Sequence, residues 1–119
     1  MSITAIAATY AYRHMVAQAA ASGGELSPIS FLAFGDWSNI YDMEQTALQS
    51  EFVRVPASLS VSGVTATARA TITHSHVGGN VLREIGAFTA SGVLVGRRVV
   101  APKEFDGDTE MDFEVSFQF

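Results

Sequence analysis

Two histidines, His74 and His76, form the one cluster in the chain with the spacing of metal ligands. Residues two apart on a strand point to the same face, so an extended segment would place both imidazoles side by side. One chain supplies too few nitrogens for a site, but a homotrimer would bring an octahedral set to its three-fold axis, suited to a first-row metal ion. The alternative is that both residues precede a Gly-Gly loop and face water.

Other chemistries have weaker patterns. A Ser-His-Asp hydrolase would need a turn of the form Gly-x-Ser-x-Gly, which the sequence lacks. The carboxylates from Glu104 to Glu114 alternate along a strand-like run without an apolar pocket to raise one pKa, which indicates a solvated face. Asp106-Gly107-Asp108 resembles the start of a calcium loop, but the closing glutamate is missing at the required spacing, so we interpret it as a turn. We therefore expect no enzyme activity and no cofactor.

Arg83 and Glu84 are a charged pair inside a run of apolar and small residues. Adjacent residues of a strand point to opposite faces, so each of these side chains needs a partner other than its neighbour. Glu51 and Arg54, in the preceding strand region, could complete a cross-strand network. We expect this network to hold the fold together, with an assembly contact as the alternative.

The elements that would position these residues follow from the periodicity of the chain. Apolar residues recur at three- and four-residue spacing from residue 3 to residue 22, which predicts an amphipathic helix whose alanine-rich stripe packs on a sheet. The helix ends at Gly23-Gly24. Residues 29–34 then predict a buried strand that enters a turn at Gly35-Asp36, and a loop follows.

Strand-like alternation dominates the rest of the chain. Residues 52–61 and 64–73 predict two long strands joined at Ser62-Gly63, and a second hairpin turns near Gly92. Residues 110–119 alternate apolar and polar side chains and predict a last strand. We therefore predict a mainly β (α+β) fold: a single domain over residues 1–119, an antiparallel β-sandwich-like sheet domain with strands over about 29–119 and one N-terminal amphipathic helix over about 3–22.

Composition narrows the possible partners. The 119 residues allow one domain, and 48% hydrophobic against 16% charged residues exclude a disordered chain and favour a surface that a partner covers. The absence of cysteine excludes disulfides and thiol catalysis and fits a reducing cytoplasm. A net charge of −5 has the wrong sign for binding nucleic acid. No apolar stretch approaches the length that a membrane span needs, so we expect no membrane partner.

Several motifs, taken in order, resemble the N-terminal domain of phage tail-collar fibre proteins. The family pattern has an N-terminal helix, a strand ending in Gly-Asp, a Thr-x-Leu segment with Glu and Arg, and an Arg-Glu-Ile-Gly strand followed by a turn and a glycine. Two departures stand out: Ala87 replaces a larger aliphatic residue, and residues 37–43 replace a segment rich in glycine or proline. The matching residues are Gly35, Asp36, Thr46, Leu48, Glu51, Arg54, Arg83, Glu84, Ile85, Gly86 and Gly92.

This resemblance implies a virion component of the tail or baseplate, made in the bacterial host cytoplasm, that anchors or organises tail fibres. Its expected partners are itself, as a homotrimer, and other phage tail, baseplate or fibre proteins. Family members continue into a shaft and a receptor-binding tip that these 119 residues lack, so receptor recognition is not carried over. The rival interpretation is a glycan-binding receptor-recognition module, or a small hydrolase-like domain, on a β-sandwich with Trp37, Tyr41 and His76 lining a pocket.

Overall fold

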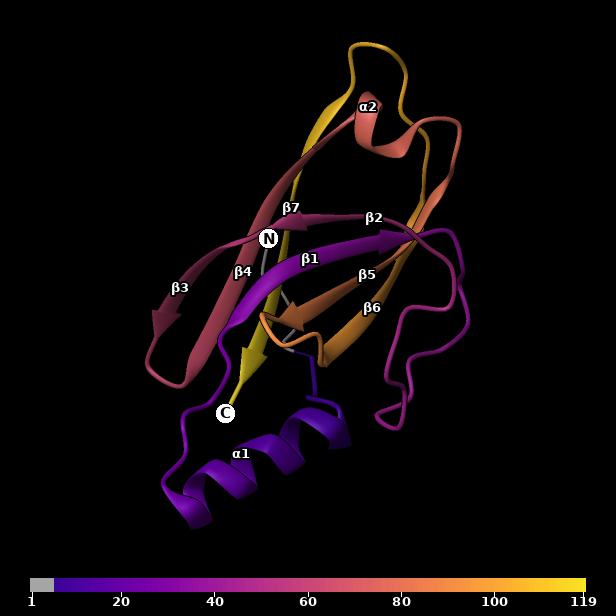
Figure 1. The fold of residues 1–119 in the computed structure, drawn as a ribbon. Helices are drawn as coiled ribbons and strands as arrows, with labels where there is room; N and C mark the ends of the chain where they lie inside the picture. Colours follow the sequence, from indigo (N-terminus) through magenta and orange to yellow (C-terminus); the bar gives the residue numbers. More distant parts are fainter. Residues whose placement is uncertain (1–5) are drawn as a thin grey trace.

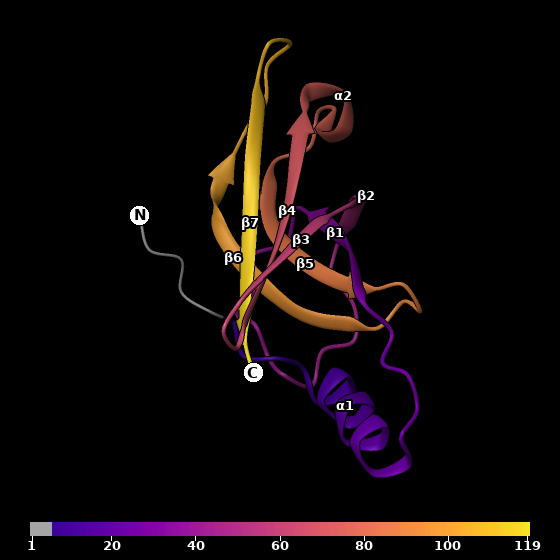
Figure 2. The ribbon, with the colours of Figure 1, turned by 90° about the vertical axis from the view of Figure 1, so that its left-hand side faces the viewer.

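The computed structural model describes residues 6–119. In chain order the elements are α1 (Tyr10–Ser22), β1 (Ile29–Gly35), β2 (Glu51–Pro56), β3 (Ser58–Ser62), β4 (Thr65–Thr73), α2 (His74–Val77), β5 (Leu82–Thr89), β6 (Leu94–Lys103) and β7 (Glu110–Gln118). The strands form two antiparallel sheets, ordered β2-β1-β5-β6 and β3-β4-β7 (Figure 1). Strands of the two sheets cross steeply, and α1 lies at one end of the molecule (Figure 2). The predicted mainly β, α+β fold is confirmed.

Both predicted hairpins are present. β3 and β4 are joined by a two-residue turn in which Gly63 has a φ of 60°, and β5 and β6 by a turn in which Gly92 has a φ of 92°. Such backbone angles are easy only for a residue without a Cβ. The last predicted strand is also confirmed, because β7 pairs with β4 over the full length of both, from Thr65 beside Gln118 to Thr73 beside Glu110.

The predicted long strand over residues 52–61 is wrong in one respect: it is two strands in different sheets. β2 pairs with β1, whereas β3 pairs with β4. The chain crosses between the sheets at Ala57, whose N–H donates to the carbonyl oxygen of Ser30 at 2.9 Å. Pro56 precedes this crossing and has no N–H to donate to a sheet ladder, which accounts for the end of β2 at that residue.

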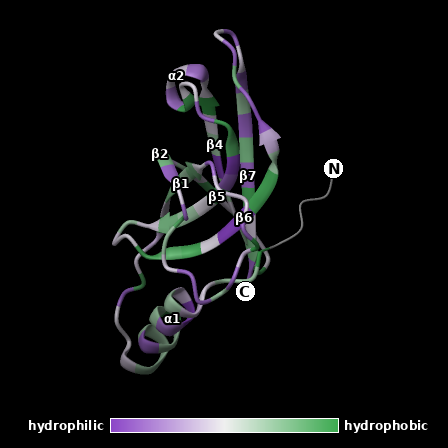
Figure 3. Ribbon diagram, turned by 90° about the vertical axis from the view of Figure 1, so that its right-hand side faces the viewer, coloured by the Kyte–Doolittle hydropathy of each residue, from purple (hydrophilic) through white to green (hydrophobic). Residues whose placement is uncertain are grey.

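The core lies between the two sheets. Phe34 of β1 meets Phe113 of β7 edge-on, with ring centroids 5.4 Å apart, and Val115 and Phe117 are 1% exposed. Hydrophobic and hydrophilic residues alternate along β7, as expected for a strand with one buried face (Figure 3). Each fully buried side chain of this size stabilises the fold by roughly 1.5 to 3 kcal/mol.

The N-terminal helix is shorter and more exposed than predicted. It begins at Tyr10, after Thr9, whose hydroxyl oxygen accepts from the N–H of Tyr12 at 3.1 Å and whose hydroxyl donates to the Leu94 carbonyl oxygen at 2.5 Å. Tyr12 is the buried residue of this helix, while most of the alanine-rich stripe faces outward. The reason is that the helix is held mainly at its first turn. Residues 3–5 of the predicted helix lie outside the described residues.

Neither of the two helices in residues 6–119 has the length and apolar character that crossing a bilayer requires.

The segment with both histidines is a helical turn, α2, and not an extended strand or an open loop. The N–H of Thr73 donates to Nδ1 of His76 at 3.0 Å, which caps this turn. Residues two apart on a helix point to nearly opposite sides. The premise that one strand face would hold His74 beside His76 is therefore wrong.

Candidate functional site

The candidate site is the loop between β1 and β2, residues 36–50, together with the sheet face beneath it. Gly35 of β1 lies beside Glu84 of β5 in the register, and Gly86 lies two residues further along. Strand alternation turns these positions away from the other sheet, because their neighbours Phe34 and Ile85 belong to the core. The loop folds over this outer face.

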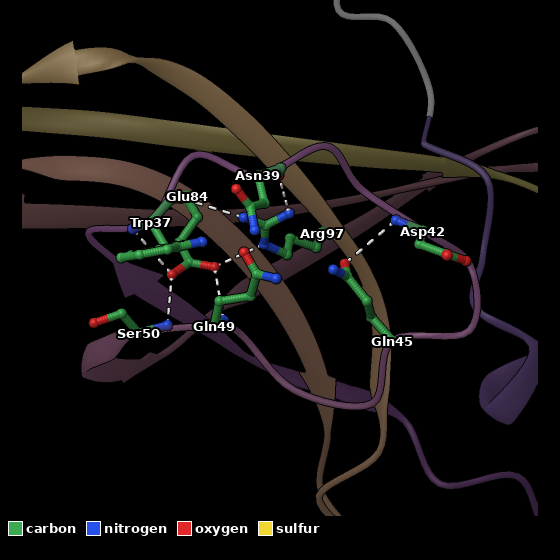
Figure 4. A network of polar contacts seen from close by, with 8 residues as sticks. All are labelled: Trp37, Asn39, Asp42, Gln45, Gln49, Ser50, Glu84 and Arg97. Carbon is green, nitrogen blue, oxygen red and sulfur yellow. Dashed lines mark hydrogen bonds and ion pairs between the residues drawn. The ribbon is translucent and has the colours of Figure 1, made fainter.

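Glu84 holds both ends of the 36–50 loop. Its Oε1 accepts from Nε of Arg97 at 2.7 Å and from the N–H of Gln49 at 3.1 Å. Its Oε2 accepts from the N–H of Ser50 at 2.9 Å and from that of Trp37 at 3.3 Å (Figure 4). Each carboxylate oxygen therefore receives two N–H groups, which fills its acceptor positions.

Arg97 of β6 completes this arrangement. The side chains of Arg97 and Glu84 are both fully buried in their ion pair. The two terminal nitrogens of Arg97 donate to the carbonyl oxygens of Asn39, at 2.7 Å, and Trp37, at 3.2 Å. A buried charge is tolerated only when it is paired and hydrogen-bonded, and both conditions are met. The Glu84–Arg97 pair is thus a structural support for the loop backbone.

Two glycines give the loop room to approach the sheet. A Cβ on Gly35 would lie 2.5 Å from the carbonyl oxygen of Ser50 and would also collide with the Glu84 carboxylate. A Cβ on Gly86 would lie 2.6 Å from Cδ2 of Leu48, a buried loop residue. Leu48 packs in a small cluster with Ala33, Phe88 and Leu94 on the outer face. Gly35, Glu84 and Gly86, which carry the family resemblance, therefore meet in one structure.

The supported loop displays large apolar side chains. Trp37 is 50% exposed and Ile40 is 89% exposed. Beside them lies a shallow hollow of about 900 Å³, lined in part by Tyr41, Met43 and Val99. The hydroxyl of Tyr41 donates to the carbonyl oxygen of Ala7 at 2.7 Å. Burial, with a smaller contribution from the charge of Asp42, raises the pKa of Tyr41 to about 12, so this hydroxyl keeps its proton near neutral pH.

The network expected around Arg83 is different from the one observed. Arg54 pairs with Glu51, through Nε at 3.0 Å and a terminal nitrogen at 2.8 Å, and its guanidinium carbon lies 3.7 Å from the centroid of the Phe88 ring. Neither residue reaches Glu84. Arg83 is partly exposed at a register shift of β5 and takes part in none of the ion pairs among residues 6–119. The partner of Glu84 is Arg97, which the sequence interpretation missed; the two arginines inside the apolar run over residues 93–101 were the available signal.

The pocket of the rival interpretation is not formed. Tyr41 lines the shallow hollow, but neither Trp37 nor His76 is among its described lining residues. His76 lies on α2, apart from the 36–50 loop (Figure 1). Within residues 6–119, no group of three or more acidic, histidine or cysteine side chains is placed to hold a metal ion. A trimeric site at His74 and His76 stays a prediction, without the strand geometry that suggested it.

The acidic stretch before and along β7 consists of a turn and a strand face. Asp106 Oδ1 accepts from the hydroxyl of Thr109 at 2.7 Å and from the N–H of Asp108 at 3.0 Å, and these hydrogen bonds lower the pKa of Asp106. Glu114 forms an ion pair with Arg69. Asp106-Gly107-Asp108 is therefore a turn, as predicted.

The comparisons with known proteins add nothing to this geometry. No protein-family model, no curated protein and no solved structure matches the chain. Functional inference therefore rests on the residues themselves.

Proposed function

We propose that this chain is a non-enzymatic structural component of a phage tail or baseplate, which anchors or organises tail fibres through protein–protein contacts. The observation that carries the proposal is the supported 36–50 loop. The Glu84–Arg97 pair holds its backbone at both ends, and the loop presents Trp37 and Ile40 to solvent. A loop that is already ordered loses little conformational entropy on binding, and exposed aromatic residues are frequent anchors of protein interfaces.

Two further observations support a structural role. The carboxylate of Glu84 receives four N–H groups, so it has no free acceptor position with which to take a proton from a substrate. The residues that resemble the tail-collar family include Gly35, Glu84 and Gly86, which build the support of the loop. In this proposal the chain is made in the bacterial cytoplasm and resides in the virion. The expected three-copy state stays a prediction.

The test is complementation in the phage that encodes the chain. Particles grown without the gene are supplied with wild-type protein or with the double variant Trp37→Ala, Ile40→Ser, and fibre-bearing tails are counted by electron microscopy. Both side chains are at least half exposed, so the double variant should keep its melting temperature and lose fibre attachment. The matched control is Val16→Ser, a 37% exposed apolar residue of α1, which should assemble like wild type.

Two outcomes would contradict the proposal. Purified particles that do not contain the chain would exclude a virion component, and normal fibre attachment by the double variant would exclude the loop as the contact. A glycan array separates the rival function, because an adaptor should bind no glycan. A receptor module should bind one defined class and lose that binding with Trp37→Ala.

A further inference from the structure

The outer edge of β3 differs from the other sheet edges in the part of the chain that the structure describes. β3 (Ser58–Ser62) reads Ser-Leu-Ser-Val-Ser, with neither a charge nor a proline, and all of it is exposed. β2 carries Glu51, Arg54 and Pro56, β6 carries Arg97 and Arg98 and ends in Pro102-Lys103, and the backbone of Ile6 pairs with β7. Charges, prolines and covering segments are the usual protection of edge strands. β3 lacks all three and is open to pairing.

The apolar side chains of β3 extend the face that its sheet turns toward the core. In the register, Val115 of β7 and Ala68 of β4 are followed across the sheet by Leu59. The neighbouring line of apolar residues across β7, β4 and β3 likewise ends on β3, at Val61. Val115 and Ala68 are buried, yet Leu59 is 42% exposed and Val61 is 75% exposed. The interior face of this sheet thus extends past the core onto β3, at the margin of the molecule (Figure 1).

We propose that a second copy of this chain pairs antiparallel with β3, about a two-fold axis that passes between the two Ser60 residues. In this register Ser60 faces its own counterpart, and Leu59 of each copy lies opposite Val61 of the other. Because β3 has the same kind of residue at equal distances on either side of Ser60, apolar side chains meet on the interior face. Serines meet on the outer face. Two three-stranded sheets become one with a continuous apolar face.

The absence of charged residues around β3 favours a second copy of the same chain as the partner at this edge. No residue from 55 to 68 is charged, although the whole chain has a net charge of −5. Two identical acidic chains repel each other, so a contact between them is most favourable where charges are absent. In addition, every second residue of an edge strand turns its N–H and C=O outward, and the symmetric register lets these groups bond to their equivalents in the other copy. The edge is self-complementary in side chains and in backbone.

The experiment measures mass in solution by sedimentation equilibrium for wild type, S60E, S60K and the neutral control S60T. Ser60 is exposed, so none of these substitutions enters the core. Wild type and S60T should reach twice the chain mass of 12.7 kDa. S60E and S60K alone should each dimerise at least about fivefold more weakly, because like charges meet across the axis. An equimolar mixture of S60E and S60K should restore the dimer, because opposite charges then meet.

Three results would overturn this pairing: a wild-type monomer at millimolar concentration, a trimer at three times 12.7 kDa, or a dimer that S60E does not weaken. Circular dichroism confirms that each variant is folded. If S60E does not fold, Val61→Thr takes its place, since threonine keeps the shape and strand preference of valine but removes apolar surface from the contact. Undiminished dimerisation of that variant would also overturn the pairing. The inference does not depend on the proposed role in a phage tail, and a dimer paired through β3 would replace the homotrimer that the family resemblance implies.

Discussion

Replacement of Glu84 by glutamine keeps the size and shape of this buried side chain but removes part of its capacity to accept hydrogen bonds. Glutamine has one acceptor oxygen and one NH₂ group, whereas the Glu84 carboxylate receives two N–H groups on each oxygen. Either orientation of the amide therefore sets its NH₂ against two donors: Arg97 and Gln49 on one side, or Ser50 and Trp37 on the other. Glu84→Gln cannot satisfy the site by rotating.

The expected cost can be worked out from these contacts. Each buried donor left without an acceptor costs about 1 to 3 kcal/mol, and breaking a buried ion pair costs about 3 to 5 kcal/mol. These two costs overlap, because breaking the ion pair already leaves a donor of Arg97 without its acceptor. We therefore expect Glu84→Gln to lower the free energy of unfolding by about 3 to 5 kcal/mol. For a chain of 119 residues this corresponds to a fall in melting temperature of roughly 10 to 20 °C.

Urea unfolding measures the loss of stability, and tryptophan fluorescence recorded in the same series measures the release of the 36–50 loop. Trp37 is the single tryptophan and its backbone is held by the Glu84–Arg97 pair, so its emission reports release of the 36–50 loop. The control is Glu44→Gln, the same change at an exposed position of the same loop, which should shift neither signal. The double variant Glu84→Gln, Arg97→Met should cost less than the sum of its parts, with a coupling of about 1 to 3 kcal/mol. A loss below about 1 kcal/mol for Glu84→Gln would refute the reasoning.

Three other outcomes can be measured on the same protein. Gly35→Ala should destabilise the fold by about 1 to 3 kcal/mol in urea, because its Cβ would collide with the backbone of the loop; wild-type stability would show that the loop can shift. Phe117→Ala should cost about 3 to 5 kcal/mol, whereas Phe119→Ala, at a 53% exposed side chain, should cost about 1 kcal/mol or less; equal losses would place both rings in the core. The raised pKa of Tyr41, about 12 in the folded state, contributes stability that is fully present below pH 10 and is lost as the pH rises through 12, so Tyr41→Phe should flatten that decline in an alkaline unfolding series.

Most strands could be predicted because burial on one face leaves a period of two in the sequence. Phe113, Val115 and Phe117 lie on the buried face of β7, as their alternation indicates. The turns at Gly63 and Gly92 could also be located, since their backbone angles favour glycine. These signals are local, and local patterns survive in any arrangement of the sheets.

Features set by contacts between distant segments could not be read from the sequence. An extended chain has the same alternation whether it stays in one sheet or changes sheet. Pro56 indicates that a strand ends there, but it does not indicate that the chain changes sheet at Ala57. The pairing of Glu84 with Arg97 depends on the register of β5 with β6, which a register shift modifies. Helical spacing identifies the residues that share a face of α1, but not whether a sheet covers that face. Among the motif residues, Glu84 supports the loop, whereas Arg83 takes part in none of the described ion pairs, and the sequence did not identify Arg97 as the partner of Glu84.

The crossing at Ala57 also determines how force passes through the molecule. A pull on β3 reaches β2 along the covalent backbone, because the two strands are separated by that single residue. The hydrogen bond from Ala57 to Ser30 fastens the crossing to β1, so the sheets cannot slide past each other at this corner without breaking it. We expect the two sheets to bear tension as one body, with the 36–50 loop moving along with them.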